Sequence, residues 1–223
     1  MPRRRTIPGS PVATPPRGAL ARRERILSVT LELIGERGVE AITMRDLALR
    51  CGVAVATLYN QFGSRESVIA EALRGDIMGR YQPVVNRTTA LDPAGKLRER
   101  VATTARGMTG PWRSYTRSMM IFYFQHTPDS HLRAVIHDFV AADFALIVHE
   151  IEALGELQPW VRPDIFADDL VTQLCSLVMK WTQGHISDRG LKSRLMRAAT
   201  TSFCGITTGE SRAAFEALAA ASA

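Results

Sequence analysis

The side chains best suited to bind another molecule lie in residues 54–62, which read AVATLYNQF. The spacing predicts a short helix that is locked in place by Val53 and Leu58 on its inner side. Small and polar side chains then face outward, so the helix can enter a major groove about 12 Å wide without steric obstruction. The chemistry predicted for this segment is hydrogen bonding and apolar contact with a nucleic-acid duplex.

A second short helix and a tight turn are expected to position that segment. Thr43 is predicted to cap a helix over about 44–51, and Asp46, three residues on, can complete a capping box. Ala48 is small where two helices would cross, and Gly52 occupies a turn of the kind that often needs a positive φ. With a longer helix before them, these elements predict a helix-turn-helix.

The stretch over residues 38–73 resembles the DNA-binding domain of the tetracycline-repressor (TetR) family. Two positions depart from the family pattern, because Ala54 stands where Ser is frequent and Gln61 where His or Tyr is usual. The resemblance implies an all-α protein with an N-terminal three-helix DNA-binding domain, a helical ligand-binding and dimerisation domain, and no cofactor. It rests on Gly38, Thr43, Ala48, Gly52, Val53, Thr57, Tyr59, Phe62, Arg65 and Glu66.

The resemblance also implies roles for individual residues on double-stranded DNA. A planar guanidinium such as that of Arg45 can bind O6 and N7 of guanine together. The alternatives are a packing role for Tyr59 and solvated surface charge for Arg45 and Arg65. The contacts expected are phosphate for Thr43, Tyr59 and Arg65, guanine for Arg45, base edges for Val55, Ala56 and Thr57, and phosphate or a base for Asn60 and Gln61.

The positive charge of the chain is concentrated near its N-terminus. Of a net charge of +6, residues 1–75 carry +5, from 12 basic and 7 acidic side chains. A basic end on a nearly neutral body is typical of a chain that docks on a polyanion through that end. We expect a flexible basic arm over 1–18, a DNA-binding domain over 19–66 and a helical effector-binding and dimerisation domain over 67–223. For the arm, a role in DNA contact and a purely solubilising role both stay open.

The second half of the chain is expected to hold an apolar effector pocket. Residues 111–126 read PWRSYTRSMMIFYFQH and are rich in methionine and aromatic side chains. Such a stripe is more often plain core than a ligand site, so both alternatives remain. The residues expected to line the pocket are Trp112, Tyr115, Met119, Phe122, Tyr123, Phe139, Phe144, His149 and Trp181.

Beyond residue 80, prolines and glycines interrupt the helical spacing at intervals, with one break at Pro83. This pattern predicts consecutive helices, about nine in the whole chain. Two amphipathic segments, at about 163–184 and 190–207, are expected to form a four-helix interface between two copies. A two-fold partner is needed because such proteins read two half-sites on DNA. A homodimer is therefore expected.

The sequence gives little support for a metal-binding protein, an enzyme, an architectural DNA binder or a membrane protein. Three separated cysteines with no C-x-x-C pair and five scattered histidines predict no metal site. There is no P-loop, G-x-G-x-x-G or G-x-S-x-G, so an enzyme is not expected. A nonspecific architectural DNA binder would need basic charge over the whole body. Without an apolar run of about 18 residues or a signal peptide, we expect a cytoplasmic protein with no membrane partner.

Overall fold

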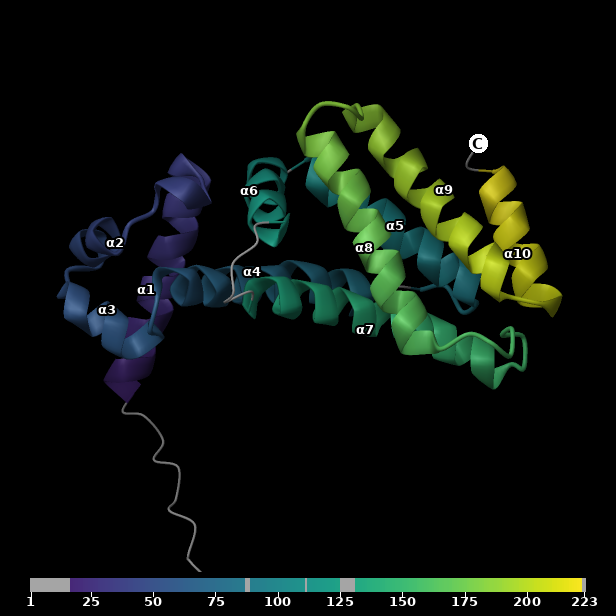
Figure 1. The fold of residues 1–223 in the computed structure, drawn as a ribbon, viewed down its shortest axis with the longest axis horizontal. Coiled ribbons are helices and arrows are strands. Elements are labelled where there is room, and N and C mark those ends of the chain that lie inside the picture. The colour runs from purple at the N-terminus through teal and green to yellow at the C-terminus, as the bar shows by residue number, and fades with distance from the viewer. Residues whose placement is uncertain (1–16, 87–88, 111, 125–130, 222–223) are drawn as a thin grey trace, which may run out of the picture.

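The computed structural model describes residues 17–86, 89–110, 112–124 and 131–221. Over these residues the chain is all-α, as predicted, and a single isolated bridge joins Leu157 to Thr207 (Figure 1). There are ten α-helices in the described part, one more than expected. The elements are α1 Arg17–Arg37, the 3-10 helix η1 Val39–Ala41, α2 Met44–Cys51, α3 Val55–Phe62, α4 Arg65–Asn86, α5 Pro93–Thr109, α6 Arg113–Phe124, α7 His131–Ala153, α8 Pro163–Thr182, α9 Asp188–Ile206 and α10 Gly209–Ala220.

The helices form two groups that α4 joins. Helices α1, α2 and α3 lie at one end of the molecule, α5 to α10 make up the rest, and α4 runs from the first group into the second (Figure 1). Helix α1 packs on α2 and α4, whereas α7 packs on α8 and α9 on α10. The predicted division between residues 66 and 67 falls in the first turn of α4. Residues 1–16 of the predicted arm lie outside the described residues.

The break predicted at Pro83 is wrong, because α4 continues through this residue to Asn86. A proline inside a helix lacks the backbone N–H and crowds the carbonyl four residues earlier, at a cost of about 3 kcal/mol. Here the proline is exposed and close to the end of the helix. The packing of α4 against α1 and α7 supplies the tertiary contacts that hold such a helix together.

The far end of the molecule is closed by α10. Phe203 of α9 stacks on Phe215 of α10 with ring centroids 4.7 Å apart, and both rings are fully buried. The Glu156 carboxylate accepts hydrogen bonds from the backbone N–H groups of Glu210 (3.0 Å) and Ser211 (2.8 Å) at the start of α10. A hydrogen bond from the Ser211 side chain, together with these two backbone bonds, holds the pKa of Glu156 below its usual value. No described helix is both long and apolar enough to cross a membrane.

Candidate DNA-binding surface and ligand cavity

The turn between α2 and α3 is built on a buried core. Leu47 and Leu58 are fully buried and Ala48 is 3% exposed, so the two helices cross closely. Gly52 adopts φ 59° and ψ 39°, in the left-handed region that favours glycine. The N–H of Val53 then donates to the carbonyl of Ala48 (3.0 Å). This geometry fixes the direction in which α3 leaves the turn.

Thr43 caps α2 as the sequence predicts. Its side-chain oxygen accepts a hydrogen bond from the backbone N–H of Asp46 (3.1 Å), and its hydroxyl donates to the Asp46 carboxylate (2.7 Å). The cap places Thr43 and Arg45 on the exposed surface at the start of α2. Because the hydroxyl is already held by Asp46, a phosphate contact by Thr43 would have to share or replace that bond.

The outer face of α3 is exposed and mixes polar with small side chains. Tyr59 is 50% exposed and Val55 37% exposed, although Leu58 between them is buried. The structure therefore brings the predicted contact residues of α3 together on one surface. This face holds Val55, Ala56, Thr57, Tyr59, Asn60 and Gln61, of which Thr57 and Gln61 are half-buried.

Arg65 differs from the other predicted contacts because it is turned toward the protein. Its Nε donates to the carbonyl of Ile42 (2.5 Å) and its Nη2 to that of Val39 (2.6 Å), while Nη1 lies 3.1 Å from Glu66. These bonds tie the start of α4 to the segment that leads into Thr43. Without DNA, the guanidinium positions the start of α2.

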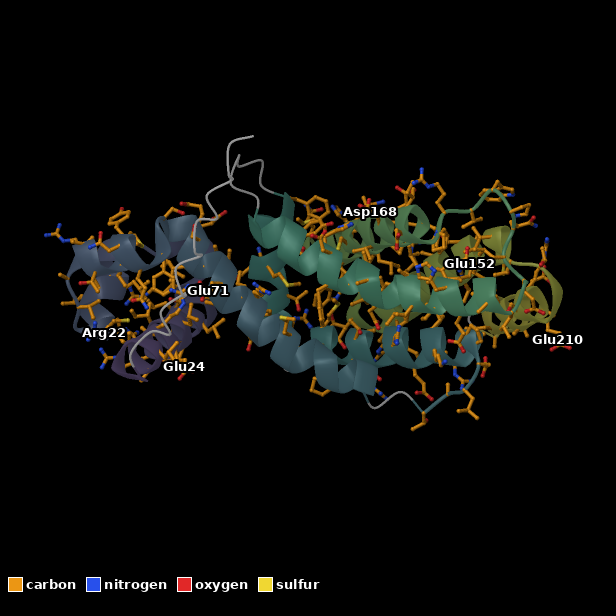
Figure 2. The ribbon with its side chains drawn as sticks, turned by 90° about the horizontal axis from the view of Figure 1, so that it is seen from below. Arg22, Glu24, Glu71, Glu152, Asp168 and Glu210 are labelled. Atoms are coloured by element: carbon orange, nitrogen blue, oxygen red, sulfur yellow. The ribbon has the colours of Figure 1, made fainter. Side chains whose placement is uncertain are left out.

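A basic groove that the sequence analysis missed runs beside α3. It lies between the start of α1 and the turn at Gly52, and Arg22, Arg25 and Thr57 are among the residues that line it. Arg25 donates to the carbonyl of Cys51 (2.5 Å) and so braces the end of α2. Arg22 is exposed and lies at the end of the molecule opposite Glu210 (Figure 2). Its place on one surface with α3 depends on packing between helices, which local spacing does not reveal.

A cavity of about 120 Å³ lies in the body between α5, α6, α7, α8 and α9. Its wall is almost entirely apolar. Four of the predicted pocket residues line it: Trp112, Tyr115, Met119 and Phe144. The other lining residues, which the sequence pattern does not indicate, are Arg100, Val101, Thr104, Met108, Thr116, Met120, Val140, Val171, Leu174, Cys175, Val178 and Leu195.

The chain matches proteins of known family in two ways. Residues 26–72 match the family model for bacterial regulatory proteins of the tetR family. The chain is also 36% identical over 97 residues to the transcriptional repressor KstR2 of Rhodococcus jostii. The aligned segment is 42% of this chain and 47% of that protein. The match to KstR of the same organism is 48% identical over 52 residues, 23% of this chain and 24% of that protein. The segment over residues 26–72 is therefore of the tetR-family type.

Solved structures with the TetR fold extend the likeness to the body. Thermus thermophilus FadR, a TetR-family repressor solved with lauroyl-CoA, superposes with a TM-score of 0.69 at 20% identity, over 84% of this chain and 96% of that one. A TetR regulator from Rhodococcus sp. RHA1 gives 0.62 at 20% identity, over 83% and 97%. At this identity the likeness shows the shared fold. The segment aligned with KstR2 spans less than half the length of that repressor.

Three of the predicted pocket residues lie elsewhere in the body of the protein. His149 is an exposed residue whose Nδ1 lies 3.1 Å from Glu152. Trp181 lines a separate hollow against α1 and α6, and its indole N–H donates to Asp188 (2.9 Å). Phe139 packs against the core outside the cavity. Periodicity along one helix could not exclude them because the cavity is closed by residues from five helices. The side chain of Phe122 lies outside the described residues.

Tyr123 is buried next to the cavity but faces a polar partner. Its hydroxyl lies 2.5 Å from Nδ1 of His137, and Nε2 of that ring lies 2.7 Å from the Asp168 carboxylate. The three groups connect α6, α7 and α8 in one row of hydrogen bonds. Tyr123 therefore anchors α6 to its neighbours and does not line the cavity.

Helix α6 is the element that connects the cavity to the N-terminal group of helices. It carries Tyr115 and Met119 into the cavity wall, and it also packs on α1 and η1. At its start, Arg113 forms an ion pair with Asp188 of α9. This bond, together with the one from Trp181, holds the pKa of Asp188 below its usual value. A displacement of α6 would therefore change its packing against both groups of helices.

Proposed function

We propose that the protein is a homodimeric repressor that binds operator DNA through α3 and is released by a small apolar or amphipathic effector in the body cavity. The observation that carries the proposal is the exposed face of α3 held on the buried turn at Gly52. The similar proteins KstR2 and FadR are both named as repressors. A dimer seated on a promoter blocks polymerase by occupancy alone, which favours repression over activation.

In this proposal, DNA contact falls into two kinds. Arg45 and the small side chains at the start of α3 read base edges, and Tyr59 and Thr43 set the register on phosphates. We add Arg22 to the phosphate contacts, because it is exposed in the groove beside α3. Arg65 supports the surface by holding the segment before Thr43 in place.

The proposed dimer forms through α8 and α9, which pack on each other and run antiparallel (Figure 1). The start of α8 is acidic and the first half of α9 is basic. A two-fold axis that crosses the helix pair would set the acidic end of one copy against the basic end of the other, which supports this interface. The charged residues are Asp164, Asp168 and Asp169 on α8, and Arg189, Lys192, Arg194 and Arg197 on α9.

Release from DNA would follow because the cavity is too small for a drug-sized ligand unless its wall moves. At about 120 Å³ it is smaller than the ~300–1,000 Å³ of pockets that enclose drug-sized ligands. A ligand such as the lauroyl-CoA held by FadR would have to move part of the wall. Because α6 forms part of that wall and packs on α1, its movement would shift the DNA-binding helices. The effector can change DNA affinity only by its differential affinity for the two states.

The test is a selection of bound fragments from a pool of random duplex DNA at physiological salt. We expect two half-sites related by inverted symmetry to be enriched, with centres one helical turn or a multiple of it apart. Tyr59→Ala should lose the enriched sequence, whereas the control Leu91→Ala, at a 90% exposed loop residue, should retain it. Enrichment of no sequence over the starting pool would reject a specific regulator in favour of a general DNA binder.

A further inference from the structure

A hollow of about 390 Å³ lies where the N-terminal group of helices meets the body. Its wall comes from the end of α1, the first half of α6 and the end of α8, and we call it the junction hollow. It shares no lining residue with the apolar cavity of the body. Its volume falls in the range of about 300–1,000 Å³ that is usual for small-molecule sites. The residues that matter here are Ile34 and Gly35 of α1, Arg113 and Arg117 of α6, and Trp181 of α8.

Two arginines of α6 give the junction hollow its charge. Arg113 and Arg117 are four residues apart, so they lie on the same face of the helix, where like charges repel. Both side chains are exposed, that of Arg113 by 59%, so a ligand in the hollow can reach their N–H groups. Gly35 leaves the opposite wall open, because an added Cβ would meet no other atom within 4 Å.

The two positive charges are only half balanced. Asp188 of α9 forms an ion pair with Arg113 and accepts a hydrogen bond from the Trp181 indole N–H (2.9 Å). In the described part of the chain, Arg117 has no ion-pair partner. The end of α1 adds only the partial negative charge of a helix C-terminus. Two guanidiniums against one carboxylate therefore leave an excess of positive charge at the hollow.

This excess and the remaining wall decide what kind of ligand fits. A carboxylate brings a single negative charge and can accept two parallel N–H bonds from a guanidinium. A phosphate monoester brings a charge of about −1.5 to −2, which exceeds the excess of the walls. The Thr182 hydroxyl already donates to the carbonyl of Met179 (2.7 Å), so the arginines supply the donors. Ile34 and Trp181 offer apolar surface beside them.

We propose that the junction hollow binds a small organic carboxylate, which bridges Arg113 and Arg117 while its apolar part packs against Ile34 and Trp181. This is a second ligand site beside the body cavity, and it does not depend on the proposed function. The carboxylate relieves the repulsion between the two guanidiniums. Because the wall joins α1 to α6 and α8, the ligand also adds contacts between the N-terminal helices and the body.

The test uses two probes of one shape, benzoate and benzamide, of which only benzoate is charged. Their binding to the full-length protein is titrated by ligand-detected NMR without DNA, so the outcome is independent of operator binding. Arg117→Gln should weaken benzoate binding roughly tenfold, as for the loss of a hydrogen bond to a charged group, and leave benzamide binding unchanged. Arg98→Gln is the matched control, because it removes the same charge from an exposed position of α5 outside the hollow. It should bind benzoate as the wild type does.

A second variant should change the affinity in the opposite direction, which damage to the fold cannot imitate. Asp188→Asn removes the carboxylate that competes for Arg113, while its amide oxygen can still accept the Trp181 N–H. We expect benzoate to bind roughly threefold more tightly, from the loss of one nearby negative charge in a watery environment. Equal affinities of the wild type for the two probes, equal effects of Arg117→Gln and Arg98→Gln, or weaker benzoate binding by Asp188→Asn would each overturn the proposal. So would failure of the wild type to bind benzoate at millimolar concentration.

Discussion

Replacement of Gly52 by alanine tests whether the turn between α2 and α3 holds the proposed DNA-binding surface in place. Gly52 has φ 59° and ψ 39°. An added Cβ would meet no other atom within 4 Å, so the substitution introduces no steric clash. Its whole effect must come from the backbone conformation. Gly35 is the matched control, because it lies inside α1 and also has open space around its Cα.

The two substitutions should change stability in opposite directions. An L-residue in the left-handed helical region costs about 1–2 kcal/mol, so Gly52→Ala should lower the free energy of unfolding by about that amount. In the interior of a helix alanine is favoured over glycine by about 0.5–1 kcal/mol, so Gly35→Ala should raise it. Gly52→Asn should recover part of the loss, because asparagine tolerates this conformation better than alanine does.

Urea unfolding at one fixed protein concentration gives the comparison, since the stability of the proposed dimer would depend on its concentration. Gly52→Ala should have a lower midpoint than the wild type, and Gly35→Ala a higher one. The reasoning would be refuted if Gly52→Ala were as stable as the wild type, or if asparagine were no better than alanine at this position. Either result would mean that the turn relaxes without strain to a conformation other than the one described.

Three further predictions concern the DNA contact, the cavity and acid stability. Arg22→Gln should weaken binding to all DNA sequences alike and reduce the slope of log K against log salt by about 0.9 per subunit, measured by titration at several salt concentrations. Gly107→Ala should impair ligand binding and cost about 1–3 kcal/mol in thermal unfolding, because its Cβ would lie 2.3 Å from the Trp112 ring in the cavity wall. Glu156→Ala should remove part of the loss of stability seen on acidification. The pKa of Glu156 is below its ordinary 4.5 in the folded protein, so its contribution is present above pH 4.5 and disappears as the pH falls through the lower, folded value.

The helix-turn-helix geometry of α2 and α3 could be predicted from the sequence because its determinants are local. The Thr43 cap depends on Asp46, three residues away, and the turn depends on the single residue Gly52. Leu58 is buried while Tyr59 is exposed, as the spacing within α3 requires. Arg65 shows the limit of this reasoning. Its position in the motif does not reveal that its guanidinium donates to carbonyls more than twenty residues earlier in the chain.

The cavity could be predicted only in part because its wall is assembled from distant segments. Trp112 and Met119 line it, whereas the equally aromatic Trp181 faces a different hollow. Arg100 lies in the run KLRER, which is typical of a solvated helix face, so its position in the cavity wall is not evident from the sequence. Its burial depends on Asp143, 43 residues further along the chain. The spacing of residues within one helix cannot reveal a contact with a residue of another helix.

The proposed function requires that the affinity for the effector and the affinity for the operator depend on each other. Helix α6 forms part of the cavity wall and packs on α1, so a ligand that displaces α6 does work on the same element that positions the DNA-binding helices. Coupling free energies are reciprocal: if the effector lowers operator affinity by a given factor, the operator lowers effector affinity by the same factor. An effector that lowers operator affinity a hundredfold must therefore bind the operator complex a hundredfold more weakly than the free dimer. A ligand that fits the 120 Å³ cavity without moving α6 should bind both forms equally and leave operator affinity unchanged. Under the proposed function, we therefore expect an effector to be larger than the cavity, whatever its affinity.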